Sequence, residues 1–234
     1  MPSPRGLSLI DLPVLDGGRT RTVTDQIFEL LYDRVVNLTL PPGAKLSEAE
    51  VAAQMGVSRQ PVRDAFYRLS QLGFIEIRPQ RATIVTPISE EAVLQAYFIR
   101  AALEEACMRV AVDRLTDDHF AALDGLIDLQ AEEIAAGNRR RFHALDDQFH
   151  HDICTFAGVE FVWTLVKENK GHMDRARYLS LSYGADTAFK EHREILGALR
   201  RRDAPAAVLA IRQHLSRIEA IIARLRIDQP QVFA

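Results

Sequence analysis

The sequence predicts a mainly α-helical protein: an N-terminal winged helix-turn-helix of three helices and a β-hairpin, then a C-terminal all-α domain like a six-helix bundle. Three observations predict this. Residues 24–85 pass from helical to β periodicity in the order helix, helix, helix, strand, strand. No strand pattern follows Pro87. Hydrophobic residues make up 47% of the 234 residues but aromatic residues only 7%, a composition that favours helices.

Composition also excludes several classes of protein. Two cysteines are too few for a disulfide framework, so we expect a cytoplasmic protein. No apolar run approaches the ~20 residues of a membrane span, and the N-terminus lacks the pattern of a secretion signal. The net charge of −3 argues against a uniformly basic nucleic-acid binder. Residues 19–87 carry +2 and residues 88–234 carry −4, which fits a small DNA-binding module on a larger acidic domain.

The first part of the chain predicts an arm and three short helices. Residues 1–18 contain three prolines and a Gly-Gly pair, so we expect a flexible arm there. Apolar spacing then predicts a helix that ends before Pro41-Pro42-Gly43, a second that Ser47 caps, and a third that Ser58 caps. The expected ranges are about 24–37, 48–55 and 59–72.

A β-hairpin is predicted directly after these helices. Residues 74–78 and 83–85 alternate as strands, and residues 79–82 contain the turn. Three helices followed by a hairpin is the layout of a winged helix-turn-helix, which we place at residues 19–87.

The start of the third helix carries side chains suited to reading DNA. Ser58, Arg59, Gln60 and Arg63 lie where this motif enters the major groove, after a tight turn that Gly56 allows. Arginine can donate two hydrogen bonds to guanine, and glutamine can pair with adenine. Arg81, at the expected wing tip, can reach a phosphate or the minor groove. The alternative is a solvated basic helix in an ordinary domain.

Residues 88–228 predict the all-helical domain, with a tail at residues 229–234. Gly, Asn, Asp and Pro residues separate the helical stretches. The expected helices are 89–114, 117–136, 139–157, 160–182, 186–201 and 204–226.

Four polar residues in this domain predict a metal site. Asp146 and His150 flank the apolar face of one helix as i, i+4 neighbours, so both can point at one ion. His192 and His214 lie on apparently buried stripes and need partners there. Asp147 and His151 share the spacing but lie opposite the apolar face, where we expect solvent. His119 and His172 also lie near apolar stripes, so burial alone leaves the set open.

The N-terminal motifs resemble those of the GntR family of bacterial regulators. The residues that carry the likeness are Gly43-x-Lys45-Leu46-x-Glu48, the stretch from Gly56 to Ala65, and Arg68-Leu69-x-x-x-Gly73. The resemblance implies that Arg59 and Arg63 contact operator bases. Ala49 stands where many members have Arg, and Ala82 stands where many have Gly. The resemblance therefore does not predict the operator sequence or the geometry of the wing.

The helical domain resembles the FCD ligand-binding domain of the FadR subgroup. The motifs are Asp146-x-x-Phe149-His150, His192-Arg193-x-Ile195, and Asp203-x-x-x-Ala207 with His214. The resemblance implies that an Asp and three His bind a divalent metal, and that a small organic acid completes its coordination. These ligands suit zinc, nickel, manganese or iron. It also places Arg100 and Arg177 as candidates to hold an effector carboxylate. The alternative for Arg100 is an ordinary salt bridge to Glu104.

Our hypothesis is a sequence-specific DNA-binding transcription regulator, expected to be a repressor. A homodimer would bind a palindromic operator, and a carboxylate or sugar acid beside the metal would change operator binding. Three alternatives stay open for the four ligands. They are a metal-dependent enzyme, a purely structural metal, and a polar core network without metal.

Overall fold

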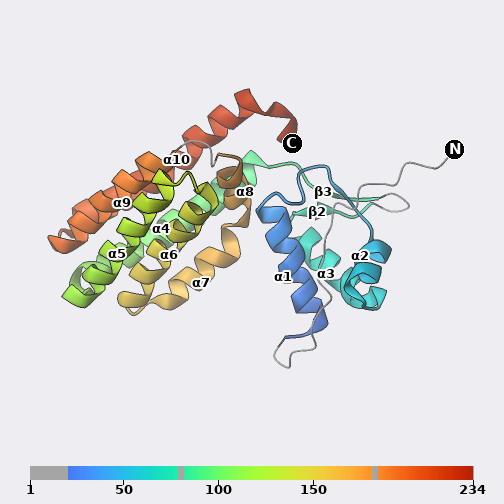
Figure 1. Ribbon diagram of the computed structural model, residues 1–234, viewed down its shortest axis with the longest axis horizontal. Helices are drawn as coiled ribbons and strands as arrows, with labels where there is room; N and C mark the ends of the chain where they lie inside the picture. The colour runs from blue at the N-terminus through green and yellow to red at the C-terminus, as the bar shows by residue number, and fades with distance from the viewer. Residues whose placement is uncertain (1–20, 79–81, 181–183, 234) are drawn as a thin grey trace. The chain divides into compact units, whose positions relative to one another are not determined.

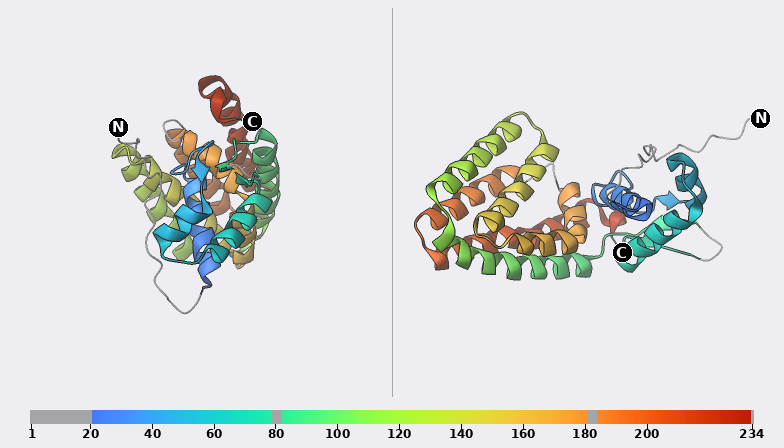
Figure 2. Two further views of the ribbon diagram at one scale, coloured as in Figure 1. Left: turned by 90° about the vertical axis from the view of Figure 1, so that its right-hand side faces the viewer. Right: turned by 90° about the horizontal axis from the view of Figure 1, so that it is seen from below.

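The structure is a computed structural model that describes residues 21–78, 82–180 and 184–233. Arg81 and the predicted arm at residues 1–18 lie outside the described residues. The chain divides into two compact units, with the boundary between Ile88 and Ser89. Figure 1 shows the elements of both units, and Figure 2 shows them from two further directions.

The N-terminal unit contains three helices and a small antiparallel sheet, as predicted for a winged helix-turn-helix. The sheet has the order β1-β3-β2, and β1 pairs with β3 in addition to the predicted hairpin of β2 and β3. The sequence analysis missed β1, and it made β2 longer than it is. The bounds are α1 Val23–Val36, β1 Lys45–Leu46, α2 Glu48–Met55, α3 Arg59–Gln71, β2 Ile75–Glu76 and β3 Thr83–Val85.

Local capping explains where these helices begin and end. Thr22 and Asp25 form a capping box at the start of α1, and the Ser47 side chain accepts a hydrogen bond at the start of α2. Gly56 ends α2 with a φ of 67°, a left-handed conformation that glycine adopts without strain. Ser58 occupies the N-cap position of α3, but its side chain makes no capping hydrogen bond. The apolar faces of α1 and α3 pack together and form the core of this unit.

The C-terminal unit is helical throughout its described length. It contains seven α-helices rather than the six predicted, because the stretch 160–182 is two helices that divide at Lys170. A short 3₁₀ helix, Pro230–Val232, lies within the predicted tail. The bounds are α4 Glu90–Arg114, α5 Asp117–Ala135, α6 Arg139–Phe156, α7 Glu160–Asn169, α8 Gly171–Leu179, α9 Ala185–Arg200 and α10 Ala204–Asp228.

The break at Lys170 has a physical cause and positions later side chains. Lys170 is buried, and its Nζ forms ion pairs with Asp147 on α6, at 2.7 Å, and with Asp174 on α8. A buried ammonium group is stable only with such partners, so the chain turns where they can be reached. Apolar periodicity alone continues through this point and therefore could not predict the break.

One apolar core holds the C-terminal unit together. The long helices α4 and α10 pack along each other, α9 packs on α10 and α5, and α5 packs on α6 (Figure 1). Fully buried residues from all five of these helices meet in the core, among them Phe149, Ile195 and Ile211. In the part of the chain that the structure describes, no helix is both long enough and apolar enough to span a membrane.

Candidate metal and effector site and the exposed helix of the winged unit

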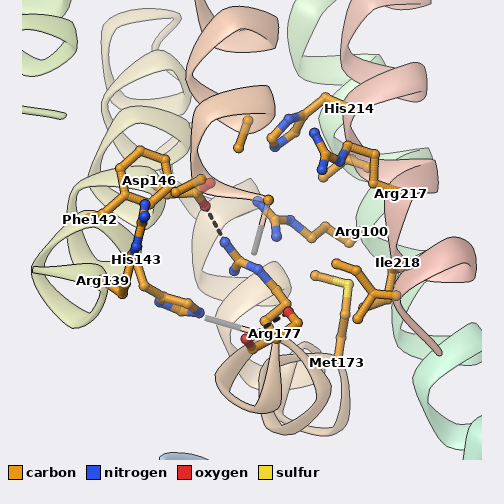
Figure 3. A pocket seen from close by; sticks show the side chains of 16 residues that line it. Arg100, Arg139, Phe142, His143, Asp146, Met173, Arg177, His214, Arg217 and Ile218 are labelled. Carbon is orange, nitrogen blue, oxygen red and sulfur yellow. Dashed lines mark hydrogen bonds and ion pairs between the residues drawn. The ribbon is translucent and has the colours of Figure 1, made fainter. Parts of the chain in front are cut away.

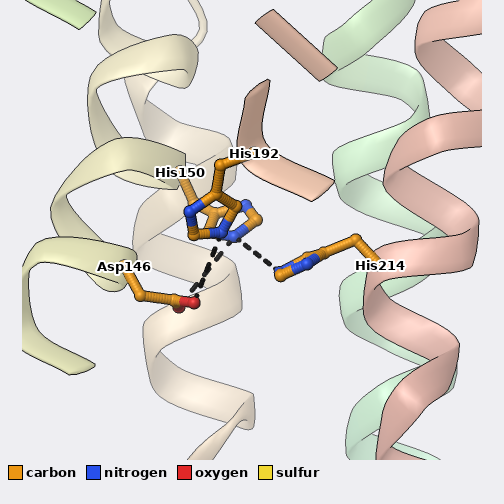
Figure 4. A group of neighbouring side chains, drawn as sticks. All are labelled: Asp146, His150, His192 and His214. Carbon is orange, nitrogen blue, oxygen red and sulfur yellow. Dashed lines mark hydrogen bonds and ion pairs between the residues drawn. The ribbon is translucent and has the colours of Figure 1, made fainter. Parts of the chain in front are cut away.

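Four buried ligand side chains from three helices converge in the C-terminal unit. Asp146 and His150 lie on α6, His192 on α9 and His214 on α10 (Figure 4). One ligand atom from each lies within 4.8 Å of the others. The His150 and His214 Nε2 atoms are 3.2 Å apart, and the His192 Nε2 atom lies 3.4 Å from Asp146 Oδ1. These are the four residues that the sequence singled out, and His119, His151 and His172 are not part of the cluster.

The second nitrogen of each imidazole ring is held by an oxygen outside the cluster. The Nδ1 partners are Glu104 for His150 at 2.5 Å, Gln130 for His192 at 2.8 Å and Glu191 for His214 at 3.0 Å. Such contacts fix the ring orientation and direct Nε2 at a common point, as carboxylate and amide groups do behind metal-binding histidines. The sequence analysis found none of these three partners.

The charge states of the cluster suit a cation. Burial alone would raise the pKa of Asp146, but the Arg177 guanidinium and the neighbouring His192 ring hold it well below its ordinary value. Burial lowers the pKa of His192 and of His214, so both rings stay neutral. An ionised carboxylate and neutral imidazoles are the forms that bind metal ions.

Unsatisfied hydrogen-bonding capacity in the cluster also fits a metal ion. Among the described residues, His192 Nε2 is buried and has no partner with hydrogen-bond geometry. A buried polar atom of this kind is costly without a partner. A metal ion bound between Asp146 and the three histidines would coordinate it, and an Asp/His₃ set of N and O ligands suits zinc, nickel, manganese or iron.

A cavity of about 90 Å³ adjoins the cluster within the C-terminal unit (Figure 3). Asp146 and His214 contribute to its wall together with four arginines, which are Arg100, Arg139, Arg177 and Arg217. Figure 3 shows Arg100 and Arg177 reaching toward the middle of the cavity. The remaining wall includes apolar side chains of α6, α8, α9 and α10.

Arg100 forms the salt bridge to Glu104 that was considered for it from sequence, and it also lines the cavity. Its Nε lies 2.5 Å from Glu104 Oε1, so the salt bridge to the residue one turn later is formed. The same side chain is buried and lines the cavity. Glu104 therefore joins Arg100 to His150. Burial would raise the Glu104 pKa, but the contacts with Arg100 and His150 lower it to about 2.

Arg177 also lines the cavity, but carboxylates occupy its guanidinium. It forms an ion pair with Asp146 and lies 3.2 Å from both Asp147 and Asp174. Burial opposes its charge, yet these carboxylates raise the Arg177 pKa. Asp147, which the sequence placed in solvent, is instead 27% exposed and paired with Lys170 and Arg177.

Sequence reasoning missed three other lining residues, Arg139, His143 and Arg217. Arg139 lies seven residues before Asp146 on the same face of α6. This spacing of seven residues is the sequence signal that could have identified Arg139 as a lining residue. His143 lies between them at helical spacing and could have been found in the same way.

In the N-terminal unit, the residues predicted to read DNA share the exposed face of α3. Ser58, Arg59, Gln60 and Arg63 are all exposed. Glu48 Oε2 lies 3.6 Å from the Arg59 guanidinium and 3.4 Å from that of Arg63.

Two neighbours on α3 add to this exposed face. Asp64 accepts a 2.8 Å hydrogen bond from Gln60. Tyr67, which the sequence analysis did not single out, is 60% exposed one turn beyond Arg63.

Comparison with known proteins agrees with this architecture. Residues 23–85 match the model of the bacterial regulatory proteins of the gntR family, and residues 95–217 match the FCD domain. The HTH-type transcriptional repressor RspR of Escherichia coli K12 is 34% identical, over 92% of this chain and 95% of the relative. A probable D-xylose utilization operon transcriptional repressor of Paenarthrobacter nicotinovorans is 31% identical, over 83% and 86%. The solved structure of E. coli McbR/YncC has a TM-score of 0.72 at 20% identity, covers 88% of this chain and 99% of that one, and shows the fold alone.

The winged helix-turn-helix and the helical domain that follows it define a DNA-binding transcription regulator. The chain belongs to the GntR family of bacterial regulatory proteins, and its FCD domain is consistent with the FadR-like subgroup. Both matched families and the relatives named above are transcriptional regulators, so the chain is classed with regulators and not with enzymes.

Proposed function

We propose that the protein is a metal-containing repressor whose operator binding is controlled by a small organic acid. The observation that carries this proposal is the buried cluster of Asp146 and three histidines, with its Nε2 atoms directed inward and a cationic cavity beside it. The relatives named as repressors support repression as the mode of regulation.

The metal would bind to Asp146, His150, His192 and His214, and the cavity would admit the acid beside it. One aspartate and three histidines fill a tetrahedral shell, but they leave a position free for an oxygen ligand when the metal is five- or six-coordinate. A purely structural metal is expected to have a closed shell with no adjoining space. The cavity next to Asp146 and His214 therefore favours sensing over a structural role, and over a polar network alone.

DNA readout is assigned to the exposed start of α3. A homodimer would place one α3 helix in each half of a palindromic operator, because two-fold protein symmetry matches two-fold DNA symmetry. Arg59 and Arg63 would contact bases, with Ser58 and Gln60 beside them. The acid would act through a difference in affinity for the two arrangements of the dimer.

Selection of genomic fragments tests the regulator assignment. Full-length protein is incubated with sheared genomic DNA of the source organism, and retained fragments are sequenced and retested by mobility shift. We expect recovery of fragments that share a palindromic site. Binding with no preference over random duplex, with or without added metal, would refute the proposal.

Native mass spectrometry of freshly purified protein tests the remaining parts together. It reports the number of chains, the bound metal and any co-purified acid in one spectrum. We expect a dimer with one metal ion per chain. A monomer with no metal after incubation with Zn²⁺ would contradict both the dimer and the metal site.

A further inference from the structure

The cavity beside the cluster follows one face of α6 away from the metal ligands. Arg139, His143 and Asp146 are spaced by four and three residues and all line it. Seven residues of α-helix advance about 10 Å, so Arg139 lies about two turns from Asp146 along this face. The cavity therefore has one end at the ligand cluster and another near the start of α6.

Unpaired guanidinium nitrogens mark two places in this cavity. Arg100 is 1% exposed, and its Nη2 is buried and has no hydrogen-bond partner among the described residues. Arg139 Nη1 is likewise buried without a partner there. A buried charged donor without an acceptor is energetically costly. Each of these two guanidinium nitrogens is therefore suited to donate a hydrogen bond to an anionic oxygen.

Arg139 differs from the other cavity arginines in having no carboxylate partner in the part of the chain that the structure describes. Arg100 pairs with Glu104, Arg177 with Asp146 and Arg217 with Glu191. Among the described residues no such pair exists for Arg139, and the first turn of α6 contains no acidic residue. A cation at a helix N-terminus is also disfavoured by the helix dipole. A bound anion at Arg139 would therefore supply the missing ion-pair partner and offset the unfavourable dipole interaction.

Size and charge together indicate the ligand class. A cavity of about 90 Å³ has room for about six water molecules, which fits a short organic acid and excludes nucleotides. A monocarboxylate brings one carboxylate to these two unpaired positions. A ligand with an acidic group at each end can meet both.

We propose that the cavity binds a small dicarboxylate, with one carboxylate at Arg100 beside the metal ligands and the other at Arg139. This inference rests on the proposed acid-sensing function and goes further by fixing the number of acidic groups on the ligand. Arg139 is then the residue that selects dianions over monoanions. The carboxylate that monoanions and dianions have in common binds at Arg100 beside the ligand cluster.

Calorimetric titration of the Zn²⁺-loaded full-length protein tests the inference. The probes are malonate, succinate, glutarate and adipate, each matched with the monocarboxylate of equal carbon number. We expect at least one dicarboxylate to bind roughly 10- to 100-fold more tightly than its match, the range of one charge-assisted contact. Arg139→Gln should remove that preference, and Arg139→Lys should retain part of it. Arg140→Gln, an exposed neighbour on the same helix turn, should leave it unchanged.

The outcomes separate this inference from the proposed function. Equal affinity for matched acids in the wild-type protein would overturn the dicarboxylate inference and leave acid sensing in place. A dicarboxylate preference that survives in Arg139→Gln would overturn the assignment of Arg139. Binding of none of these acids to metal-loaded protein would overturn this inference and count against the acid-sensing function as well. Circular dichroism of each variant checks that a loss of binding is not a loss of folding.

Discussion

At the scale of single residues, the capacity of a cavity arginine to bind a ligand depends on how many neighbouring carboxylates already pair with its guanidinium. Arg100 and Arg177 both line the cavity, but three carboxylates pair with Arg177, whereas among the described residues only Glu104 pairs with Arg100. The family resemblance named both arginines as candidates to hold an effector carboxylate. Only the three-dimensional set of partners distinguishes them, because those partners come from different helices.

The first residue-scale prediction concerns DNA readout by Arg63. Its side chain is 58% exposed on α3, and its ion pair with Glu48 is long enough to exchange for a base contact. We expect Arg63→Ala to weaken specific operator binding by roughly 1–3 kcal/mol, the value of one bidentate base contact. Fluorescence anisotropy with operator and random duplex measures this. Gln71→Ala, exposed at the far end of α3, is the control, and equal affinities for wild type and Arg63→Ala would remove Arg63 from the readout set.

The second residue-scale prediction concerns Glu104, which contacts both His150 and Arg100. Glu104→Gln removes the charge that compensates buried Arg100, so we expect a loss of roughly 3–5 kcal/mol in the free energy of unfolding. It also weakens the orientation of His150, for which we expect a 10- to 100-fold loss of metal affinity. Urea unfolding and competition with a chromogenic chelator measure the two effects. Unchanged metal affinity in a folded variant would show that this contact is not needed.

At the scale of secondary-structure elements, the sequence predicted most helices because their apolar stripes and caps are local. The start of α2 follows from Ser47 and the end of α2 from Gly56. Two elements escaped prediction for reasons that are not local. Strand β1 is two residues long and exists through pairing with β3, and the division of α7 from α8 depends on where Lys170 finds carboxylates.

The contact between α6 and α8 predicts a pH dependence of stability. His143 stacks on Tyr178, with ring centroids 4.6 Å apart. Burial, aided by Arg177, lowers the His143 pKa to about 4, whereas it is about 6.5 in an unfolded chain. Between these values the unfolded chain binds more protons, so stability is present above pH 6.5 and is lost as the pH falls toward 4.

When the pH falls from 7.5 to 5, the lowered pKa of His143 should reduce the free energy of unfolding by about 2 kcal/mol. Urea unfolding at both pH values should therefore show a smaller loss for His143→Asn than for wild type. His151→Asn, at a position 30% exposed, is the matched control. Identical pH dependence in wild type and His143→Asn would contradict the assignment.

At the scale of the whole molecule, reading and sensing are assigned to separate units. The exposed α3 residues lie before the boundary at Ile88 and the ligand cluster lies after it. The four ligands themselves could be predicted from sequence, because helical spacing paired Asp146 with His150 and the family resemblance completed the set. The groups behind them, Glu104, Gln130 and Glu191, could not, because each approaches from another part of the chain.

This separation predicts that sensing can be lost while reading is kept. His192→Ala should bind operator within about twofold of wild type, since His192 and the α3 residues belong to separate units and share no partners in the structure's described residues. It should no longer respond to the acid that modulates the wild-type protein. Mobility shift with and without that acid measures both properties. A folded His192→Ala protein that still responds to the acid would show that sensing does not depend on the cluster.

The metal content of three proteins tests the central claim most directly. Wild type, His192→Ala and His151→Ala are loaded with Zn²⁺, desalted and measured by inductively coupled plasma mass spectrometry. His192 contributes a buried inward-facing nitrogen, whereas His151 is the next residue after a ligand but is not in the cluster. We expect one metal ion per chain in wild type and His151→Ala and a sharp loss in His192→Ala. Equal metal in all three, or none in wild type, would contradict the account.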